Sequence, residues 1–89
     1  MTNTHLYIKN KLYDIINNLK PELSNTEIEF INSGIRTGNY NLALEILCDI
    51  LIEKEISIDL KTYELIHDIC ITLNLETHNS DILKSQIIY

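Results

Sequence analysis

The stretch GNYNLALEILCDILIEKE, residues 38–55, is the most apolar part of this 89-residue chain and predicts an α-helix over about 40–54. At 100° per residue its apolar side chains cover most of the helix circumference: Tyr40, Ala43, Leu44, Leu47, Ile50 and Leu51, with Ile46 and Cys48 on the flanks. Only a narrow polar strip remains, formed by Asn41, Glu45, Asp49 and Glu53. Such a helix is expected at the centre of its domain, with the other segments packed around it.

A first amphipathic helix is predicted over residues 4–19. Its apolar side chains form one stripe: Ile8, Leu12, Ile15, Ile16 and Leu19. Pro21 is expected to end this helix by forcing Lys20 out of the helical region.

A second helix, about 25–36, has a well-marked start. Ser24 and Glu27 form a capping box, in which each side chain bonds the other residue's backbone amide. The helix is expected to end near Gly38, where glycine can adopt the left-handed conformation. The short link that follows makes the second and third helices antiparallel neighbours. Phe30 falls far from the buried stripe, so it is either an isolated exposed ring or a contact residue.

After the central helix, residues 55–59 alternate apolar and polar side chains. We interpret them as a tight connection, because a short strand without a partner is not stable. Asp59 is a plausible N-cap for a fourth helix over about 60–74. Its outer face is expected to carry Glu64, His67 and Asp68.

The last segment, 75–89, is either a short fifth helix capped by Asn79 or Ser80, or a docked tail. The expected fold is therefore all-α: one domain over 1–89, a compact bundle of four to five helices around the 40–54 helix.

Charge narrows the class of protein. The formal charge is −6 with only seven Lys and Arg residues, which disfavours nucleic-acid binding, because phosphate recognition depends on those side chains. No apolar run reaches the ~18–20 residues that span a bilayer, and the N-terminal residues do not resemble a signal peptide. We expect a cytoplasmic protein without a membrane or nucleic-acid partner. Its acidic surface suits a basic protein partner, or serves solubility alone.

No motif in the chain indicates an enzyme. The hydrolase elbow G-x-S-x-G, the zinc motif H-E-x-x-H and the phosphate loop are absent. His5, His67 and His78 are scattered and are interpreted as surface side chains. Cys48 and Cys70 are expected to be free core thiols, with a disulfide or a reactive thiol as the alternative. We therefore expect no catalytic activity, cofactor or metal.

The acidic strip of the central helix is the candidate partner-binding site. Glu45, Asp49 and Glu53 are spaced four residues apart, and like charges at that spacing cost a helix a few tenths of a kcal/mol per pair. The strip is either a solvated face or a surface that docks onto a cationic patch of another protein. Glu64 and Asp68 would extend that surface if their helix lies beside it.

The order of residues in this region resembles the MafI family of bacterial immunity proteins. The resemblance covers roughly residues 22–75. It is carried by Leu23-Ser24-x-x-Glu27-Ile28, Gly38-Asn39-Tyr40, Leu42-Ala43-Leu44-Glu45, Leu47-Cys48-Asp49, Leu51, Ile56-Ser57-Ile58 and Thr62-Tyr63-Glu64-Leu65-Ile66.

This resemblance implies a small helical antitoxin that binds the toxic C-terminal domain of a secreted bacterial toxin, as in contact-dependent growth inhibition. Those toxin domains are commonly nucleases, often acting on RNA. The expected mechanism is occlusion of the active site or substrate path by a monomer in a 1:1 complex. The alternative is a helical adaptor or regulatory module that binds an amphipathic helix in a groove.

Overall fold

The computed structural model describes residues 4–75 and 78–88, without the side chains of residues 78 and 79. Five α-helices and a two-stranded parallel sheet account for most of these residues. In chain order the elements are α1 Thr4–Leu19, the 3-10 helix η1 Lys20–Glu22, α2 Asn25–Arg36, α3 Tyr40–Glu53, β1 Ile58–Asp59, α4 Leu60–Thr72, α5 His78–Leu83, the 3-10 helix η2 Lys84–Gln86 and β2 Ile87–Ile88. The predicted all-α fold is confirmed, and the ends of the first four helices lie within two residues of the predicted ones.

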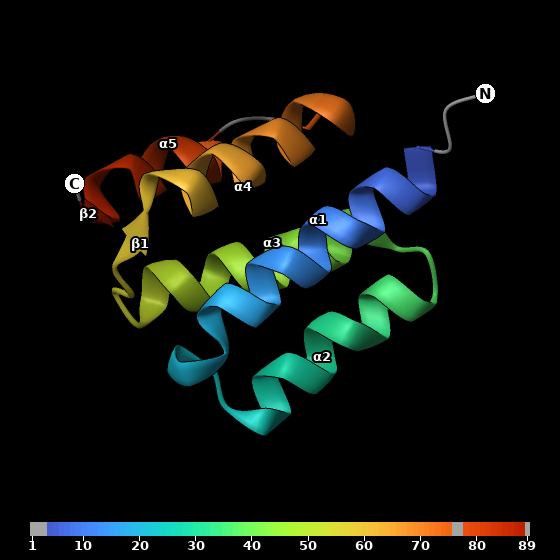
Figure 1. The fold of residues 1–89 in the computed structure, drawn as a ribbon, viewed down its shortest axis with the longest axis horizontal. Coiled ribbons are helices and arrows are strands. Elements are labelled where there is room, and N and C mark those ends of the chain that lie inside the picture. The colour runs from blue at the N-terminus through green and yellow to red at the C-terminus, as the bar shows by residue number, and fades with distance from the viewer. Residues whose placement is uncertain (1–3, 76–77, 89) are drawn as a thin grey trace.

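The helices form a layered arrangement with α1 and α3 in the middle (Figure 1). α2 covers one side of this pair, and α4 and α5 cover the other. α3 packs on α2, α1 and α5, and buries six side chains: Tyr40, Ala43, Leu44, Leu47, Cys48 and Leu51. The central position predicted for the 40–54 helix is therefore confirmed.

α2 and α3 lie close together at Gly34 and Ala43. A Cβ atom on Gly34 would lie 3.0 Å from the Cβ of Ala43 and 3.1 Å from its backbone nitrogen. Gly38 has a φ of +74°, which glycine adopts without strain, and turns the chain between the two helices. The Asn39 amide then donates to the Gly34 carbonyl at 2.9 Å. Small residues at the contact and a tight turn thus hold α2 against α3.

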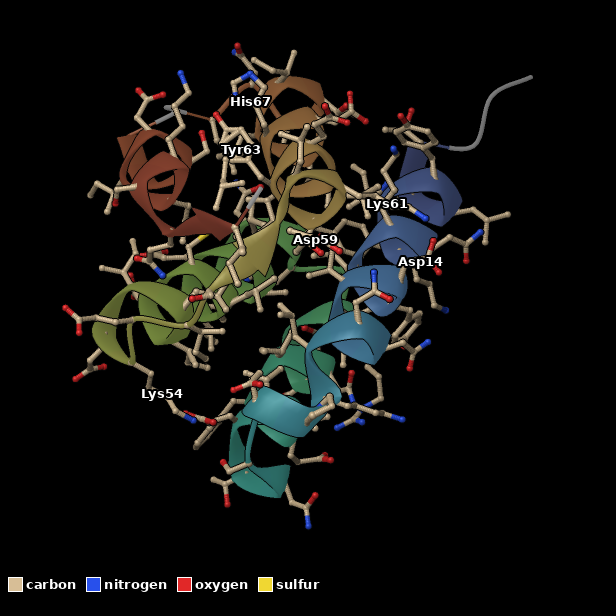
Figure 2. The ribbon with its side chains drawn as sticks, turned by 60° about the vertical axis from the view of Figure 1, so that its left-hand side comes forward. Asp14, Lys54, Asp59, Lys61, Tyr63 and His67 are labelled. Atoms are coloured by element: carbon tan, nitrogen blue, oxygen red, sulfur yellow. The ribbon has the colours of Figure 1, made fainter. Side chains whose placement is uncertain are left out.

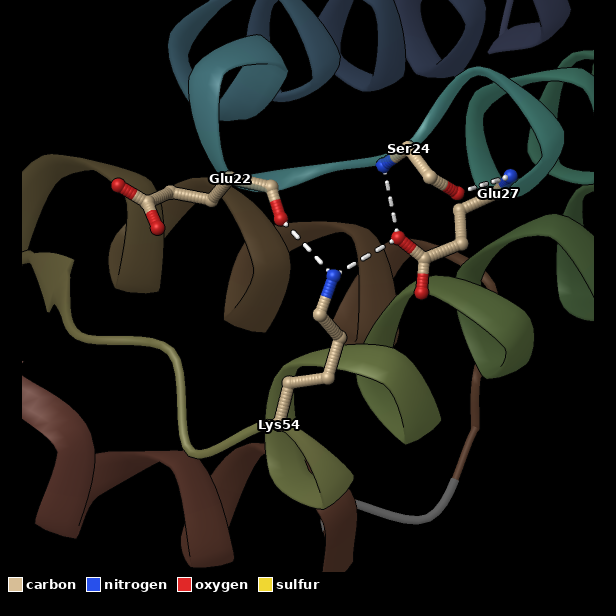
Figure 3. A network of polar contacts seen from close by, with 4 residues as sticks. All are labelled: Glu22, Ser24, Glu27 and Lys54. Carbon is tan, nitrogen blue, oxygen red and sulfur yellow. Dashed lines mark hydrogen bonds and ion pairs between the residues drawn. The ribbon is translucent and has the colours of Figure 1, made fainter.

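A polar network ties the start of α2 to the end of α3 (Figure 3). The predicted capping box is confirmed: the Ser24 amide donates to Glu27 Oε1 at 2.8 Å, and the Glu27 amide donates to Ser24 Oγ at 3.1 Å. Lys54 Nζ lies 3.0 Å from Glu27 Oε1 and donates to the Glu22 carbonyl at 3.1 Å. The Ser24 amide and the Lys54 ammonium together lower the pKa of Glu27.

The prediction that Pro21 forces Lys20 out of the helical region is wrong. α1 ends at Leu19 as expected, but Lys20–Glu22 continues as a 3-10 turn closed by a bond from the Leu23 amide to the Lys20 carbonyl at 3.2 Å. Proline is tolerated in the first turn of a helix, because its missing N–H would have no partner there. The proline therefore ends the α-helix without ending the helical path of the chain.

The interpretation of residues 55–59 as a connection without a strand is also wrong. β1 pairs with β2 in parallel, with Ile58 opposite Ile87 and Asp59 opposite Ile88. The partner that a lone strand would lack is supplied by the C-terminal segment. Asp59 also caps α4 as predicted, because its side chain accepts from the Thr62 amide at 2.7 Å.

The C-terminal segment forms both a short helix and a docked strand. α5 begins at His78, so the predicted caps Asn79 and Ser80 lie inside the helix. Ser80 is fully buried with its Oγ 3.3 Å from His67 Nδ1, so packing on α4 places it there. Gln86 then fixes the segment to the end of α3: its Nε2 donates to the carbonyls of Leu51 and Ile56, each at 2.8 Å.

We predict that Gly34→Val lowers the free energy of unfolding by about 1–3 kcal/mol, because the added side chain must push α2 away from Ala43. Ser33→Val, at the neighbouring exposed position of the same helix, should change it by less than about 0.5 kcal/mol. Urea unfolding followed by circular dichroism measures both values. Equal effects of the two substitutions would show that the close approach does not limit side-chain size.

We predict that Gln86→Glu destabilises the protein by about 1–3 kcal/mol, because two buried carbonyl contacts lose their donor and face a negative charge instead. Ser85→Glu adds the same charge at an exposed neighbouring position and serves as the control. Thermal unfolding and hydrogen exchange of the amides in residues 83–88 report the change. An unaltered exchange pattern in Gln86→Glu would contradict this role.

Candidate partner-binding site

The three acids predicted for the outer side of α3 form a continuous acidic row: Glu45, Asp49 and Glu53. All three side chains are exposed, and each is one turn, about 6 Å, from the next. Within the described ranges 4–75 and 78–88, none of them forms an ion pair or a side-chain hydrogen bond. The buried side of α3 is held by the core, so the row stands on a well-anchored helix.

The base nearest to the row in sequence does not neutralise it. Lys54 follows Glu53 directly, but its ammonium is directed to Glu27 and to the Glu22 carbonyl (Figure 3). The Lys54 side chain therefore points away from the acidic row. Lys54 forms no ion pair with the acidic row.

A second row of side chains runs along α3 beside the acidic row. This apolar row consists of Leu42, Ile46 and Ile50, again spaced by four residues. Leu42 is 44% exposed, and the two isoleucines are partly buried against the core. Sequence reasoning missed Leu42, although its spacing from Ile46 is a signal that could have revealed the row.

The two remaining candidate acids lie elsewhere. Glu64 and Asp68 line an open groove of about 420 Å³, and all of its lining residues come from α1 and α4: Tyr7, Lys11, Lys61, Glu64, Leu65 and Asp68. Figure 2 shows Lys61 on the α1 side of α4. α4 packs chiefly on α1 and α5, whereas α3 packs chiefly on α2 and α5. The five candidate acids therefore do not form one surface.

Asp68 is occupied by contacts within the fold. The Tyr7 hydroxyl donates to Asp68 Oδ2 at 2.6 Å, and Lys11 Nζ lies 3.0 Å from the same oxygen. The Lys11 ammonium also sits 4.7 Å from the centre of the Tyr7 ring. The Tyr7 and Lys11 hydrogen bonds lower the pKa of Asp68, and the Asp68 carboxylate raises the pKa of Lys11. Asp68 therefore joins α4 to α1 and is not available to a partner in the way the acidic row is.

The prediction that His67 lies on the outer face of α4 with Glu64 and Asp68 is wrong. His67 is partly buried, stacks on Tyr63 with ring centres 5.9 Å apart, and approaches Ser80 of α5 (Figure 2). The docking of α5 on this side of α4 covers it. His5 is exposed, and the side chain of His78 lies outside the described residues.

Both cysteines are free and buried, as predicted. Burial raises the pKa of the Cys48 thiol to about 12, with smaller contributions from Cys70 and Asp49, and burial also raises the pKa of Cys70. A thiol in this state is a poor nucleophile at neutral pH. The cysteines therefore act as small core residues.

Within residues 4–75 and 78–88, no group of three or more His, Cys, Asp or Glu side chains is arranged to hold a metal ion. Over the same residues, no helix has the length and apolar character to cross a membrane.

We predict that Asp68→Asn makes the acid-side loss of stability shallower. Because folding lowers the pKa of Asp68, its stabilising contribution is present above the ordinary carboxyl pKa of 3.8 and disappears as the pH falls through the lowered value. Thermal unfolding between about pH 5 and pH 3 measures this slope. Glu64→Gln, in the same groove, should retain the wild-type slope. Identical slopes for all three proteins would contradict the assigned role of the Tyr7–Lys11–Asp68 contact.

Comparison with protein-family models, with curated proteins and with solved structures gives no match for this chain. What marks the candidate site is its own chemistry. An acidic row that forms no ion pair within the described residues runs next to a row of apolar side chains, on a helix whose other side forms the core.

Proposed function

We propose that this chain is an immunity protein, which binds the toxic domain of a secreted bacterial toxin and blocks its activity. The observation that carries the proposal is the acidic row Glu45, Asp49 and Glu53 on the exposed side of α3, which forms no ion pair within residues 4–75 and 78–88. Further support is the resemblance of residues 22–75 to the MafI family. Glu45 and Asp49 belong both to the acidic row and to the residues that carry this resemblance.

The charge pattern favours a basic partner. Three like charges one turn apart repel each other, and a partner cation placed between them relieves that repulsion. A nuclease offers such cations, because a surface that attracts phosphates also attracts carboxylates. The expected toxin domain is therefore a basic nuclease, in keeping with the formal charge of −6 on this chain.

The mechanism involves no reaction by this chain. α3 is fixed between α2, α1 and α5, so the helix backbone that carries the acidic row is already in place before the partner arrives. The bound protein covers the toxin's active site or its substrate path, as a monomer in a 1:1 complex. Inhibition then lasts as long as the complex does.

The direct test is co-expression of this chain with the toxin domain encoded immediately upstream. Rescue of growth and co-purification of a 1:1 complex are the expected results. A soluble, folded chain that neither rescues growth nor co-purifies with that domain would overturn the proposal.

We predict that Glu45→Lys with Asp49→Lys slows association with the toxin about tenfold or more at low salt, because the attraction that steers the encounter is reversed. Surface plasmon resonance at two salt concentrations measures the rate, and the difference should shrink at high salt.

The matched control is Asp14→Lys with Glu64→Lys, which changes the net charge equally on exposed positions of α1 and α4. It should alter the association rate by about twofold at most. Equal slowing by the two double variants would mean that net charge alone matters and that the acidic row is only a solvated face.

A further inference from the structure

Phe30 is the most prominent apolar side chain of α2, and its position relative to α3 follows from two contacts on either side of it. Gly34, one turn after Phe30, lies against Ala43. Glu27, nearly one turn before Phe30, pairs with Lys54 at the other end of α3. α2 and α3 are antiparallel neighbours (Figure 1). The α2 position of Phe30 therefore falls between these two contacts along α3.

Helical periodicity places Phe30 on the side of the apolar row. Ile46 and Ile50 follow Ala43 by three and seven residues, which puts them on the edge of α3 nearest to α2. Phe30 is 60% exposed, so its ring stands on the outer face of the two helices and not between them and the core. The exposed face thus runs from Phe30 across the apolar row to the acidic row.

The surface next to Phe30 is also hollowed. A shallow recess of about 390 Å³ lies along the first half of α2, lined by Asn25, Thr26, Glu29 and Phe30. The ring therefore forms one wall of a recess with polar groups around it. An exposed aromatic ring beside a recess is typical of an interface anchor, because an aromatic side chain buries a large apolar area when a partner covers it.

The negative charge of the acidic row indicates which kind of protein can bind this face. A second copy would place one acidic row near another in a chain that already carries a formal charge of −6, so self-association is opposed. A partner whose apolar recess is bordered on one side by Lys or Arg can contact the apolar row with the recess and the acidic row with its cations.

We propose that Phe30, Leu42 and Ile46 are the apolar anchor of the toxin complex, and that they enter an apolar recess of a basic protein whose rim cations meet Glu45, Asp49 and Glu53. This inference rests on the proposed function and assigns separate roles to the acidic row and the apolar anchor. The acidic row sets how fast the partner arrives, because long-range charge acts on encounter. The apolar anchor sets how long the partner stays, because most affinity differences lie in the dissociation rate.

The test measures both rate constants for a catalytically inactive form of the co-purified toxin domain. Phe30→Ala should raise the dissociation rate about 30-fold, as expected of a hot-spot aromatic residue. Its association rate should stay within about threefold of the wild type, since no charge changes. Leu42→Ala should raise the dissociation rate by a smaller factor.

The matched control is Ile71→Ala on α4, because Ile71 is 58% exposed and lies on a helix outside this face. It should leave both rate constants within about twofold of the wild type. Circular dichroism establishes that each variant is folded, and all three positions are exposed, so their truncation should not disturb the core.

The outcomes separate the two proposals. If the wild-type chain forms no complex with the toxin domain, the proposed function fails and this inference fails with it. If the complex forms but Phe30→Ala dissociates no faster than Ile71→Ala, the proposed function stands and the apolar anchor is overturned. If Phe30→Ala slows association and leaves dissociation unchanged, the role assigned to the apolar anchor is also contradicted.

Discussion

The contact between Gly34 and Ala43 determines how the rest of this small protein can be arranged. Because neither residue carries more than a methyl group, α2 lies closely along α3, and the tight turn at Gly38 returns the chain directly from one helix to the other. α3 is thereby covered on one side by α2, and α1 and α5 cover the rest of its buried side. The same geometry leaves the outer sides of α2 and α3 next to each other, as one exposed face.

The helices could be predicted from the sequence because their signals are local. The capping box of Ser24 and Glu27, the proline after α1 and the Asp59 cap each act within a few residues. α2 and α4 begin directly after their caps, and α1 ends just before the proline. The parallel pair of β1 and β2 could not be predicted in this way. Ile58 pairs with Ile87, which is 29 positions later in the sequence. Each strand has only two residues, too few to show the alternation of apolar and polar side chains that predicts a strand.

The candidate site was predictable to a similar degree and for similar reasons. The acidic row needed only the periodicity of one helix, so Glu45, Asp49 and Glu53 are exposed together as expected. Whether Glu64 and Asp68 lie on the same surface as these three acids depends on how α4 is rotated against α1. The local sequence pattern of α4 does not predict that rotation. Asp68 instead binds Tyr7 and Lys11, where it contributes to packing and not to an open surface.

The two groups of acids illustrate how this chain uses its charge. At the α1–α4 groove a carboxylate is satisfied within the fold, and its lowered pKa reflects that partnership. On α3 the carboxylates have no such partner within the described residues, and the one nearby lysine, Lys54, is committed to the α2 cap. In the proposed complex, cations of the toxin domain would relieve the repulsion along this row.

The proposed immunity function requires that a bound toxin domain cover the outer side of α3. Carbodiimide labelling of carboxyl groups, read by mass spectrometry with and without the bound toxin domain, tests it most directly. We expect labelling of Glu45, Asp49 and Glu53 to fall strongly in the complex, while Glu64, exposed on a different helix, is labelled as before. If the complex forms and labelling of the acidic row does not fall, or if Glu64 is protected in its place, the toxin domain does not bind the outer side of α3.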